Sequence, residues 1–314
     1  MNRLYLLLLL LLLAISLPAF PQAFTYKAID IPGAMETQVR GVNSSGEIVG
    51  FYKTTSCVDF NIQFPNCPVH GFKITNGVLT KLLVPHSTWT DIMGVNDFGD
   101  LVGFAITSDT GAHAFLWTHK NVITYFNTPE GGTNSDVHPV AMSVNKALIV
   151  GGSDWFFGNM APNGGWVWAN GKFGIMNPGD SSGGCCPDGE GVNGISNNGF
   201  LSGQNSDQGH VTAWFKSGHD EDFYPLDSDV VGTGVNNNAD VIGFSVDGKG
   251  FFAKHIELNE GANDAVEVKP SFIPVSFPGA KATYPFGLSD KRMIGGTYVD
   301  SNGGVHGFIA TPNF

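Results

Sequence analysis

A twelve-residue sequence, GVNSSGEIVGFY at positions 41–52, recurs five more times along the chain in degraded form. The later copies begin at Gly94, Ser143, Gly194, Gly234 and Gly287 and read GVNDFGDLVGFA, SVNKALIVGGS, GISNNGFLSGQN, GVNNNADVIGFS and GLSDKRMIGGTY. Neighbouring copies start 40 to 53 residues apart, and a period in this range is typical of solenoids and propellers. The repeated residues are explained by their role in the fold. Residues that carry function are therefore expected mainly in the loops between repeats.

Each repeat predicts four short strands, which we denote a, b, c and d. In the first repeat they are residues 38–43, 47–52, 70–74 and 78–84, and in the second 92–96, 100–106, 113–117 and 122–127. The Asn76-Gly77 pair between c and d predicts a hairpin, because both central residues of that turn need positive φ. Strand d usually ends in proline, which fits a strand end where no ladder donor is lost; these prolines are Pro32, Pro85, Pro129, Pro178, Pro225 and Pro278.

The two ends of the chain complement each other. Residues 24–32 have the pattern of a d strand with no a, b or c before it, and the sixth repeat ends with a c strand at 306–310. We therefore predict an all-β fold, a six-bladed β-propeller closed by the N-terminal strand pairing with the C-terminal blade. Closure removes the exposed strand edges of an open array. The alternative, an open β-solenoid, gives no reason for the offset termini.

The first residues have the pattern of an export signal. Met1, Asn2 and Arg3 precede an apolar run from Leu4 to Leu17 and small residues up to Ala23, as in a secretory leader. We predict a signal peptide at 1–23, one propeller domain at 24–314, and a secreted, periplasmic or extracellular location. A retained one-pass membrane anchor is the alternative.

Composition limits the partners. The net charge is −12, and charged residues make up only 14% of the chain, so nucleic acid and anionic lipid are poor partners. Glycine accounts for 42 of the 314 residues, which is about twice its usual share of ~7% and indicates many tight turns. We expect a monomer with no membrane contact once the leader is removed.

The combined pattern of PGA, GVN with a polar-Gly turn, IVG, and HGF or HAFLW resembles the HAF-repeat extracellular proteins of bacteria. The resemblance covers nearly all of the chain after the leader. It implies export and a propeller-like repeat, but it carries no established activity, substrate or catalytic residue. The third repeat lacks the turn glycine around Asn145, and Ala239 replaces it in the fifth, so these two turns are expected to differ.

Two sets of repeated polar residues have structural explanations. Asn43, Asn96, Asn145 and Asn236 stand between strands a and b, where asparagine accepts a left-handed turn conformation. His70, His113 and His306 occupy equivalent places at the start of strand c. Equivalent positions in separate blades indicate blade packing rather than a shared metal site.

The four cysteines suggest disulfides in an exported chain. Cys57 and Cys67 bracket an insertion without a repeat counterpart, and we predict that they are joined. The adjacent Cys185 and Cys186 could form a vicinal ring, stay reduced, or bond to another chain. Zinc is not expected, since Cys-x-x-Cys pairs are missing.

Cofactors are not expected either. Calcium could use acidic turns such as 300–303, whose oxygen atoms alternate along the chain, but hairpin turns demand the same residues. The sequence GDSSGG at 179–184 departs by one serine from a serine-protease nucleophile loop, and we assign no catalytic residue.

In a propeller the d-to-a and b-to-c loops share one face, and these loops are long and varied. Aromatic and carboxylate groups on converging loops suit a neutral polar ligand such as a glycan. The candidate binding residues, of which the first three are the strongest, are Trp89, His138, Tyr284, His86, Asp91, Asp136 and Asp229.

The sequence thus favours a non-catalytic binding or interaction module for a glycan, a protein or a cell-envelope component. One alternative is an extracellular polysaccharide hydrolase or lyase, with two of Asp91, Asp136, His138 and Asp229 as acid and base. Another is a purely structural surface module.

Overall fold

The computed structural model describes residues 22–55, 68–107, 111–126, 137–156, 161–176, 191–205, 210–214, 220–223, 230–254 and 272–314. Within these ranges the regular structure consists of strands β1 to β24, without a helix. The all-β prediction is therefore confirmed. No described segment forms a helix that could cross a membrane, and the predicted leader lies almost entirely outside the described ranges.

Consecutive strands pair antiparallel in groups of four, which we call units. Unit 1 contains β2 (Glu36–Val42), β3 (Ile48–Lys53), β4 (Val69–Thr75) and β5 (Val78–Leu82). Unit 2 contains β6 (Ser87–Val95), β7 (Leu101–Thr107), β8 (Gly111–Trp117) and β9 (Ile123–Phe126). A single parallel bridge between Val69 and Trp89 joins these two units into one eight-stranded sheet.

The next three units repeat the same order. Unit 3 contains β10 (Val137–Val144), β11 (Val150–Phe156), β12 (Ala161–Ala169) and β13 (Lys172–Met176). Unit 4 contains β14 (Gly191–Ile195), β15 (Leu201–Asn205), β16 (His210–Trp214) and β17 (Asp220–Phe223). Unit 5 contains β18 (Val230–Val235), β19 (Val241–Ser245), β20 (Gly250–Ala253) and β21 (Phe272–Val275).

Unit 6 takes its outer strand from the other end of the chain. It contains β22 (Ala282–Leu288), β23 (Ile294–Val299), β24 (Val305–Pro312) and then β1 (Phe24–Ile29). Strand β1 runs antiparallel to β24, with Phe24 opposite Pro312 and Ile29 opposite Gly307. The predicted pairing of the first strand with the last sheet is confirmed.

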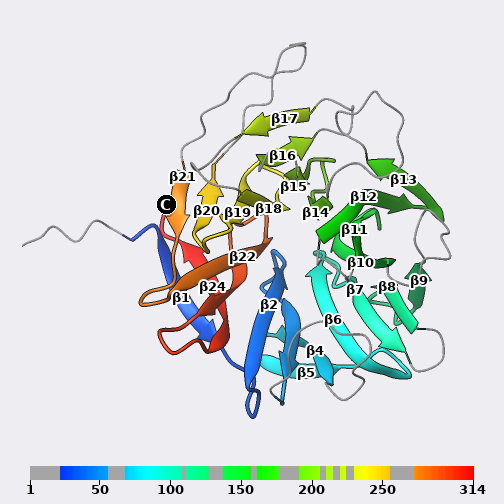
Figure 1. Cartoon of the computed structure of the whole chain (residues 1–314), viewed down its shortest axis with the longest axis horizontal. Helices are drawn as coiled ribbons and strands as arrows, with labels where there is room; N and C mark the ends of the chain where they lie inside the picture. The colour runs from blue at the N-terminus through cyan, green and yellow to red at the C-terminus, as the bar shows by residue number, and fades with distance from the viewer. Residues whose placement is uncertain are drawn as a thin grey trace, which may run out of the picture.

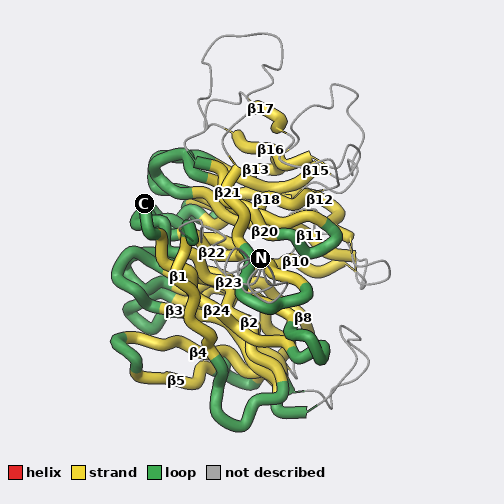
Figure 2. Tube along the Cα trace, turned by 90° about the vertical axis from the view of Figure 1, so that its left-hand side faces the viewer, coloured by secondary structure: helices red, strands yellow, loops and turns green. Residues whose placement is uncertain are grey.

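The first strand of each unit lies nearest the middle of the molecule (Figure 1). These inner strands are β2, β6, β10, β14, β18 and β22, and each contacts the next, including β22 with β2. Figure 2 shows the same sheets from the side, with the connections gathered at their edges. We call the end where the inner strands begin the loop side, and the end with the β2–β3 type turns the turn side.

Close approach of the inner strands explains the glycine of the repeated motif. A Cβ atom on Gly287 would lie 2.7 Å from the Gly41 Cα, and one on Gly41 would lie 3.2 Å from the Gly94 Cα. One on Gly194 would lie 2.9 Å from the Gly234 Cα. Because real Cβ atoms need more room than this, a larger residue would push neighbouring strands apart.

The expected difference in the third and fifth turns is wrong. All six turns carry a left-handed residue at the same place, three positions after the asparagine or serine. In the third and fifth units Leu148 (φ 57°) and Ala239 (φ 56°) adopt it, and in the sixth Arg292 (φ 62°) does so. The asparagines themselves do not have positive φ. The hydrogen bonds of the turn hold its shape even where a non-glycine residue is strained.

The hairpin predicted at Asn76-Gly77 is confirmed. Both residues have positive φ, 52° and 78°, and Thr75 faces Val78 directly. The largest departure among the expected strands is β6, which begins at Ser87 rather than at residue 92, because its pairing with β7 continues as far as Thr107.

Candidate functional site

The loop-side ends of β2 and β3 carry a connected series of polar side chains, which we call the charged row. Lys53 Nζ lies 3.2 Å from Glu36 Oε2. Gln38 Nε2 donates to Glu36 Oε1, and Arg40 Nη2 donates to Gln38 Oε1 at 2.7 Å. Glu36, Gln38 and Arg40 alternate with the buried Thr37 and Val39 along β2, so the strand's period of two places them on one face.

Arg40 is held against two aromatic rings. Its guanidinium carbon lies 3.9 Å from the ring centroid of Phe286 and 5.3 Å from that of Phe51. Such cation–π contacts stabilise a guanidinium that has lost water. Burial lowers the pKa of Arg40 to about 10, against the opposing charges of Asp91 and Glu36. Arg40 therefore stays charged at neutral pH.

Among the described residues, Asp91 on β6 is a carboxyl whose pKa is raised, and it can therefore hold a proton near neutral pH. Asp91 is only 4% exposed to solvent. Burial raises the pKa of Asp91 to about 7, although a hydrogen bond from Trp89 and the charges of Arg40 and Lys53 act in the opposite direction. Near neutral pH this carboxyl is thus divided between its neutral and ionised forms.

The structure brings four of the predicted binding residues to the loop side, but two of them, Trp89 and Asp91, are buried. Trp89 is 8% exposed and Asp91 is buried beside it on β6. Tyr284 is half-buried on β22, with its ring edge-on to Phe244 at 5.0 Å. His86 is exposed in the turn before β6 and has a φ of 62°. Trp89 and Asp91 therefore belong to the packed interior.

The other predicted residues have no described side chain. The backbone of His138 forms part of β10, but its side chain lies outside the described part of the structure. Asp136 and Asp229 lie outside the described ranges, as do the four cysteines, Cys57, Cys67, Cys185 and Cys186. The Cys57–Cys67 disulfide stays a prediction, and the three alternatives for Cys185 and Cys186 stand as stated above.

Sequence reasoning missed Gln38, Arg40 and Lys53. The repeat could have indicated Gln38 as a candidate site residue. It stands three residues before the motif glycine Gly41, which is the position that Asp91 and Tyr284 occupy before Gly94 and Gly287. Arg40 occupies the position of a β-bulge that recurs on all six inner strands. The equivalent bulge residues are Met93, Met142, Asn193, Thr233 and Phe286.

The turn side holds a polar cavity of about 50 Å³, which we call the turn-side mouth. The turns between the first and second strands of units 1, 2, 3, 4 and 6 line it, together with Val235 at the end of β18. Asparagines join these turns to one another: Asn43 Nδ2 donates to Asn96 O at 2.9 Å, and Asn96 Nδ2 donates to Asn145 O at 3.0 Å. Asn145 and Asn236 donate in the same way to Ser196 O and Ser289 O.

The same asparagines shape their own turns. Asn43 Oδ1 accepts hydrogen bonds from the backbone N–H groups of Ser45 and Glu47, and the equivalent oxygens of Asn96, Asn145 and Asn236 each accept two such bonds. These asparagines therefore have a structural role in the turn, but they act through side-chain hydrogen bonds and not through the predicted left-handed backbone. Each one also connects neighbouring units.

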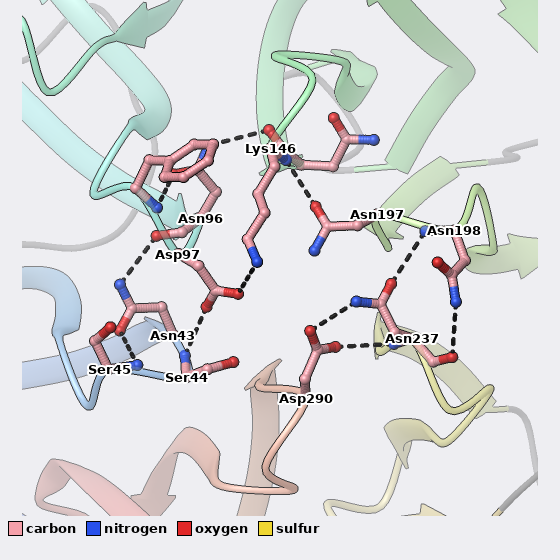
Figure 3. Close-up of polar contacts among 12 residues, drawn as sticks. Asn43, Ser44, Ser45, Asn96, Asp97, Lys146, Asn197, Asn198, Asn237 and Asp290 are labelled. Carbon is pink, nitrogen blue, oxygen red and sulfur yellow. Dashed lines mark hydrogen bonds and ion pairs between the residues drawn. The ribbon is translucent and has the colours of Figure 1, made fainter.

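The next residue of each turn forms a second layer (Figure 3). Ser44 N donates to Asp97 Oδ1 at 2.8 Å, and Lys146 Nζ lies 2.9 Å from Asp97 Oδ2. Lys146 N donates to Asn197 Oδ1 at 2.7 Å. Asn237 donates to Asp290 from both its backbone N (2.9 Å) and its Nδ2 (2.7 Å).

The repeated histidines pack against tyrosines. The ring centroids of His70 and Tyr52 lie 5.3 Å apart, and those of His306 and Tyr298 lie 5.0 Å apart. His306 Nδ1 also lies 2.8 Å from Asp30 Oδ1, which ties the residue after β1 to β24. These contacts support the expected packing role.

Within the described ranges no group of three or more His, Cys, Asp or Glu residues is arranged to hold a metal ion. At the acidic turn considered for calcium, Asp300 Oδ1 accepts hydrogen bonds from the backbone N–H groups of Asn302 and Gly304, each at 2.7 Å. These bonds lower the pKa of Asp300, as expected for a carboxylate that shapes its own turn.

Comparison with known proteins identifies the fold. A catalytically inactive virginiamycin B lyase from Staphylococcus aureus, solved with quinupristin, matches 92% of this chain and 99% of its own, with 11% identity and a TM-score of 0.51. A putative gluconolactonase matches 94% of both chains, with 12% identity and a TM-score of 0.51. These are β-propeller proteins. No family model and no curated protein matches the sequence.

Proposed function

We propose that this protein is a six-bladed β-propeller of the HAF-repeat type, exported through a leader at residues 1–23, and that it binds a glycan without catalysis. Six units of four strands, the β1–β24 pairing and the contact between β22 and β2 support the six-bladed closed form. The likeness to solved structures supports the propeller fold and does not extend to their activities, since identity is only 11–12%.

The charged row is the observation that carries the binding proposal. Along Lys53, Glu36, Gln38 and Arg40 each side chain is held by its neighbour, so little conformational freedom is lost when a ligand binds. Glu36 and Gln38 remain half-exposed. A sugar hydroxyl is both a donor and an acceptor, and the row offers both functions side by side. Tyr284, three residues before the motif glycine of unit 6, supplies an aromatic surface near the same end.

A glycan array screened with the mature protein tests this proposal. For a glycan that binds, Glu36→Gln and Gln38→Ala should each weaken affinity several-fold. Glu36→Gln replaces a carboxylate acceptor by an amide donor, Gln38→Ala removes the amide, and each lost hydrogen bond is worth about 1 kcal/mol. The melting temperature should also fall, because Lys53 and Arg40 each lose a partner, so melting curves are needed to show that both variants remain folded during the binding assay. Ser45→Ala, on an exposed turn-side residue, is the control. Unchanged affinity in both row variants, with a loss in the control, would place the ligand on the other face.

A hydrolase or lyase acting on polysaccharide is the second candidate. The raised pKa of Asp91 suits a general acid, but Asp91 is buried, so this function also requires that the interior around β6 open to admit the glycan. Incubating any bound glycan with the parent protein and with Asp91→Asn separates the two functions. Cleavage by the parent alone would establish the enzyme. An intact glycan in both samples supports the binding module.

A further inference from the structure

Arg40 is a charged side chain that receives no counter-ion from the described part of the chain. Among the described residues its guanidinium takes part in no ion pair, and its hydrogen bond runs from Nη2 to Gln38 Oε1. Its Nε is buried and has no hydrogen-bond partner there. Arginine is seldom buried unless it is paired, because removing a charge from water costs free energy that a partner must offset. This guanidinium therefore lacks the anion that such a position normally has.

The two carboxyl groups whose charges act on Arg40 do not supply that anion. Glu36 is engaged by Lys53 at 3.2 Å and by the amide of Gln38. Asp91 forms no described ion pair with Arg40, and its Oδ1 is buried without a hydrogen-bond partner among the described residues. Its pKa is raised to about 7 although Arg40 acts to lower it, whereas a carboxyl in close contact with a guanidinium would stay ionised. Arg40 and Asp91 are therefore neighbours but not a pair.

The surroundings of Arg40 hold the guanidinium in place and leave N–H groups available. The rings of Phe286 and Phe51 lie 3.9 Å and 5.3 Å from its guanidinium carbon, and an aromatic ring stabilises the charge without neutralising it. Arg40 is half-buried, and its Nη2 reaches Gln38, which lies two residues nearer the loop side. An anion can therefore approach the guanidinium from the loop side.

The local charges favour a carboxylate as that anion. With Glu36 paired to Lys53, Arg40 contributes an uncompensated positive charge whenever Asp91 is neutral. A carboxylate carries one negative charge and can accept two parallel hydrogen bonds from a guanidinium. A doubly charged phosphate would be repelled more strongly by Glu36 and by ionised Asp91. The net charge of −12 has a smaller influence, because physiological salt screens exposed charges beyond about 8 Å.

We propose that the ligand of the charged row is an acidic glycan, in which the carboxylate of a uronate sugar pairs with the Arg40 guanidinium. This inference rests on the glycan binding proposed above and names the class of sugar. The sugar ring lies along the half-exposed Glu36 and Gln38, where its hydroxyl groups find partners. Ionised Asp91 repels the ligand's carboxylate, so binding is strongest when Asp91 is neutral. The other titratable groups around Asp91 include Lys53 on β3 and His138 on β10, whose side chain lies outside the described part of the structure.

A glycan array that contains uronate glycans beside their methyl esters separates this inference from the proposal on which it rests. We expect hits that carry uronate carboxylates. Hits that are all neutral or sulfated would leave glycan binding intact and overturn the acidic class. An array without hits would contradict glycan binding itself, and the inference would fall with it.

For a uronate glycan that binds, its methyl ester is the matched ligand, because esterification removes the charge and leaves the sugar. The parent should bind the acid about tenfold or more tightly than the ester, as expected for a hydrogen bond to a charged group. Arg40→Met should bind both equally. General damage weakens both ligands alike, so the ratio stays informative if stability falls. An unchanged preference for the acid in folded Arg40→Met would overturn the pairing. If that variant does not fold, Arg40→Lys, which loses the planar fork, should show a reduced ratio, and an unchanged ratio would overturn the pairing.

Asp91→Asn and Lys249→Met complete the test. In the parent the affinity for the acid should fall as the pH rises through about 7, while the affinity for the ester stays constant, and Asp91→Asn should abolish the fall. A fall that persists in Asp91→Asn would remove Asp91 from the inference. Lys249→Met deletes a positive charge from an exposed ion pair with Asp247 in the β19–β20 turn on the same side, and it should leave the acid-to-ester ratio unchanged. An equal loss of the ratio in Lys249→Met and Arg40→Met would reduce the preference to a general effect of charge and overturn the pairing.

Discussion

Among the residues, Asp91 couples the packing of the interior most directly to pH. Its pKa is raised to about 7 in the folded chain, against about 3.9 in an unfolded one, so the folded protein holds the proton more tightly. The stability that the neutral carboxyl contributes is complete below about pH 4 and is lost as the pH rises through about 7.

Asp91→Asn keeps the neutral form at every pH. Its free energy of unfolding should exceed that of the parent by an amount that grows between pH 4 and pH 7 and is then constant. The upper limit is about 4 kcal/mol, at about 1.4 kcal/mol per pKa unit. Urea unfolding of both proteins at pH 4, 5.5 and 8 measures the difference. A difference that does not vary with pH would contradict the assignment, and the exposed Asp247→Asn gives the background.

The left-handed turn positions allow a paired test at the same scale. Ala239→Gly should raise the free energy of unfolding by up to about 1 kcal/mol. The left-handed conformation costs an L-residue about 1–2 kcal/mol, and glycine avoids this cost. Loss of the buried methyl group offsets only part of that gain. Gly46→Ala should lower stability by about 1 kcal/mol. The nearest atom to the added methyl would be Met293 Cε at 3.9 Å, so the cost is conformational rather than steric. If Gly46→Ala leaves the free energy of unfolding unchanged, backbone strain at these turns does not affect stability.

At the scale of elements, the asparagines connect the units through side-chain bonds to the next turn. Asn96 illustrates the two tasks, since Oδ1 shapes its own turn and Nδ2 donates to Asn145 O. Asn96→Ser retains an oxygen for the turn, as Ser196 and Ser289 do in their units, while Asn96→Ala loses both functions.

We expect a loss of about 1 kcal/mol for Asn96→Ser and of about 2–3 kcal/mol for Asn96→Ala, since buried groups left without a partner cost more than one net hydrogen bond. Chemical denaturation measures both changes. Equal losses would mean that the turn oxygen contributes nothing and that the link between units carries the whole effect.

The elements were predictable from the sequence where the repeat specified them. Alternation, turn residues and strand-ending prolines located the strands, and the unmatched d strand identified the partner of β1. The turn geometry was predicted less well, because a missing glycine suggested a new turn at Leu148 and Ala239. Backbone hydrogen bonds to Asn145 Oδ1 and Asn236 Oδ1 preserve the turn against that local preference.

The site was predicted less completely. The position of Trp89, Asp91 and Tyr284 near one end of the inner strands followed from topology, but the burial of Trp89 and Asp91 did not. Burial depends on how far neighbouring strands approach, and that distance is set by glycines such as Gly41 and Gly287 in different repeats. The charged row was missed because Arg40 faces Phe286 across a boundary between units, a contact that no single repeat contains.

For the whole molecule, the cysteines offer a test of export. We predict a Cys57–Cys67 disulfide in secreted material, since the insertion between them lacks a repeat counterpart that would pack it. A bridge closing a loop of this size contributes up to about 3 kcal/mol in the chain-entropy picture. Non-reducing peptide mapping should recover the two cysteines in one linked fragment, and free thiols at both would refute the prediction. The same map would show whether Phe24 is the first residue.

The pairing of β1 with β24 also sets the order in which the molecule can be completed. Hydrogen-bonded residues at this junction, Thr25 and Asn313, are 288 positions apart in the chain. At about 5–20 residues per second, synthesis leaves β1 without its partner for roughly 15 to 60 seconds. During that interval its edge can pair with another chain, and such non-local closure is intrinsically slow. The nascent protein therefore has a vulnerable period that ends only when its last strand has been made.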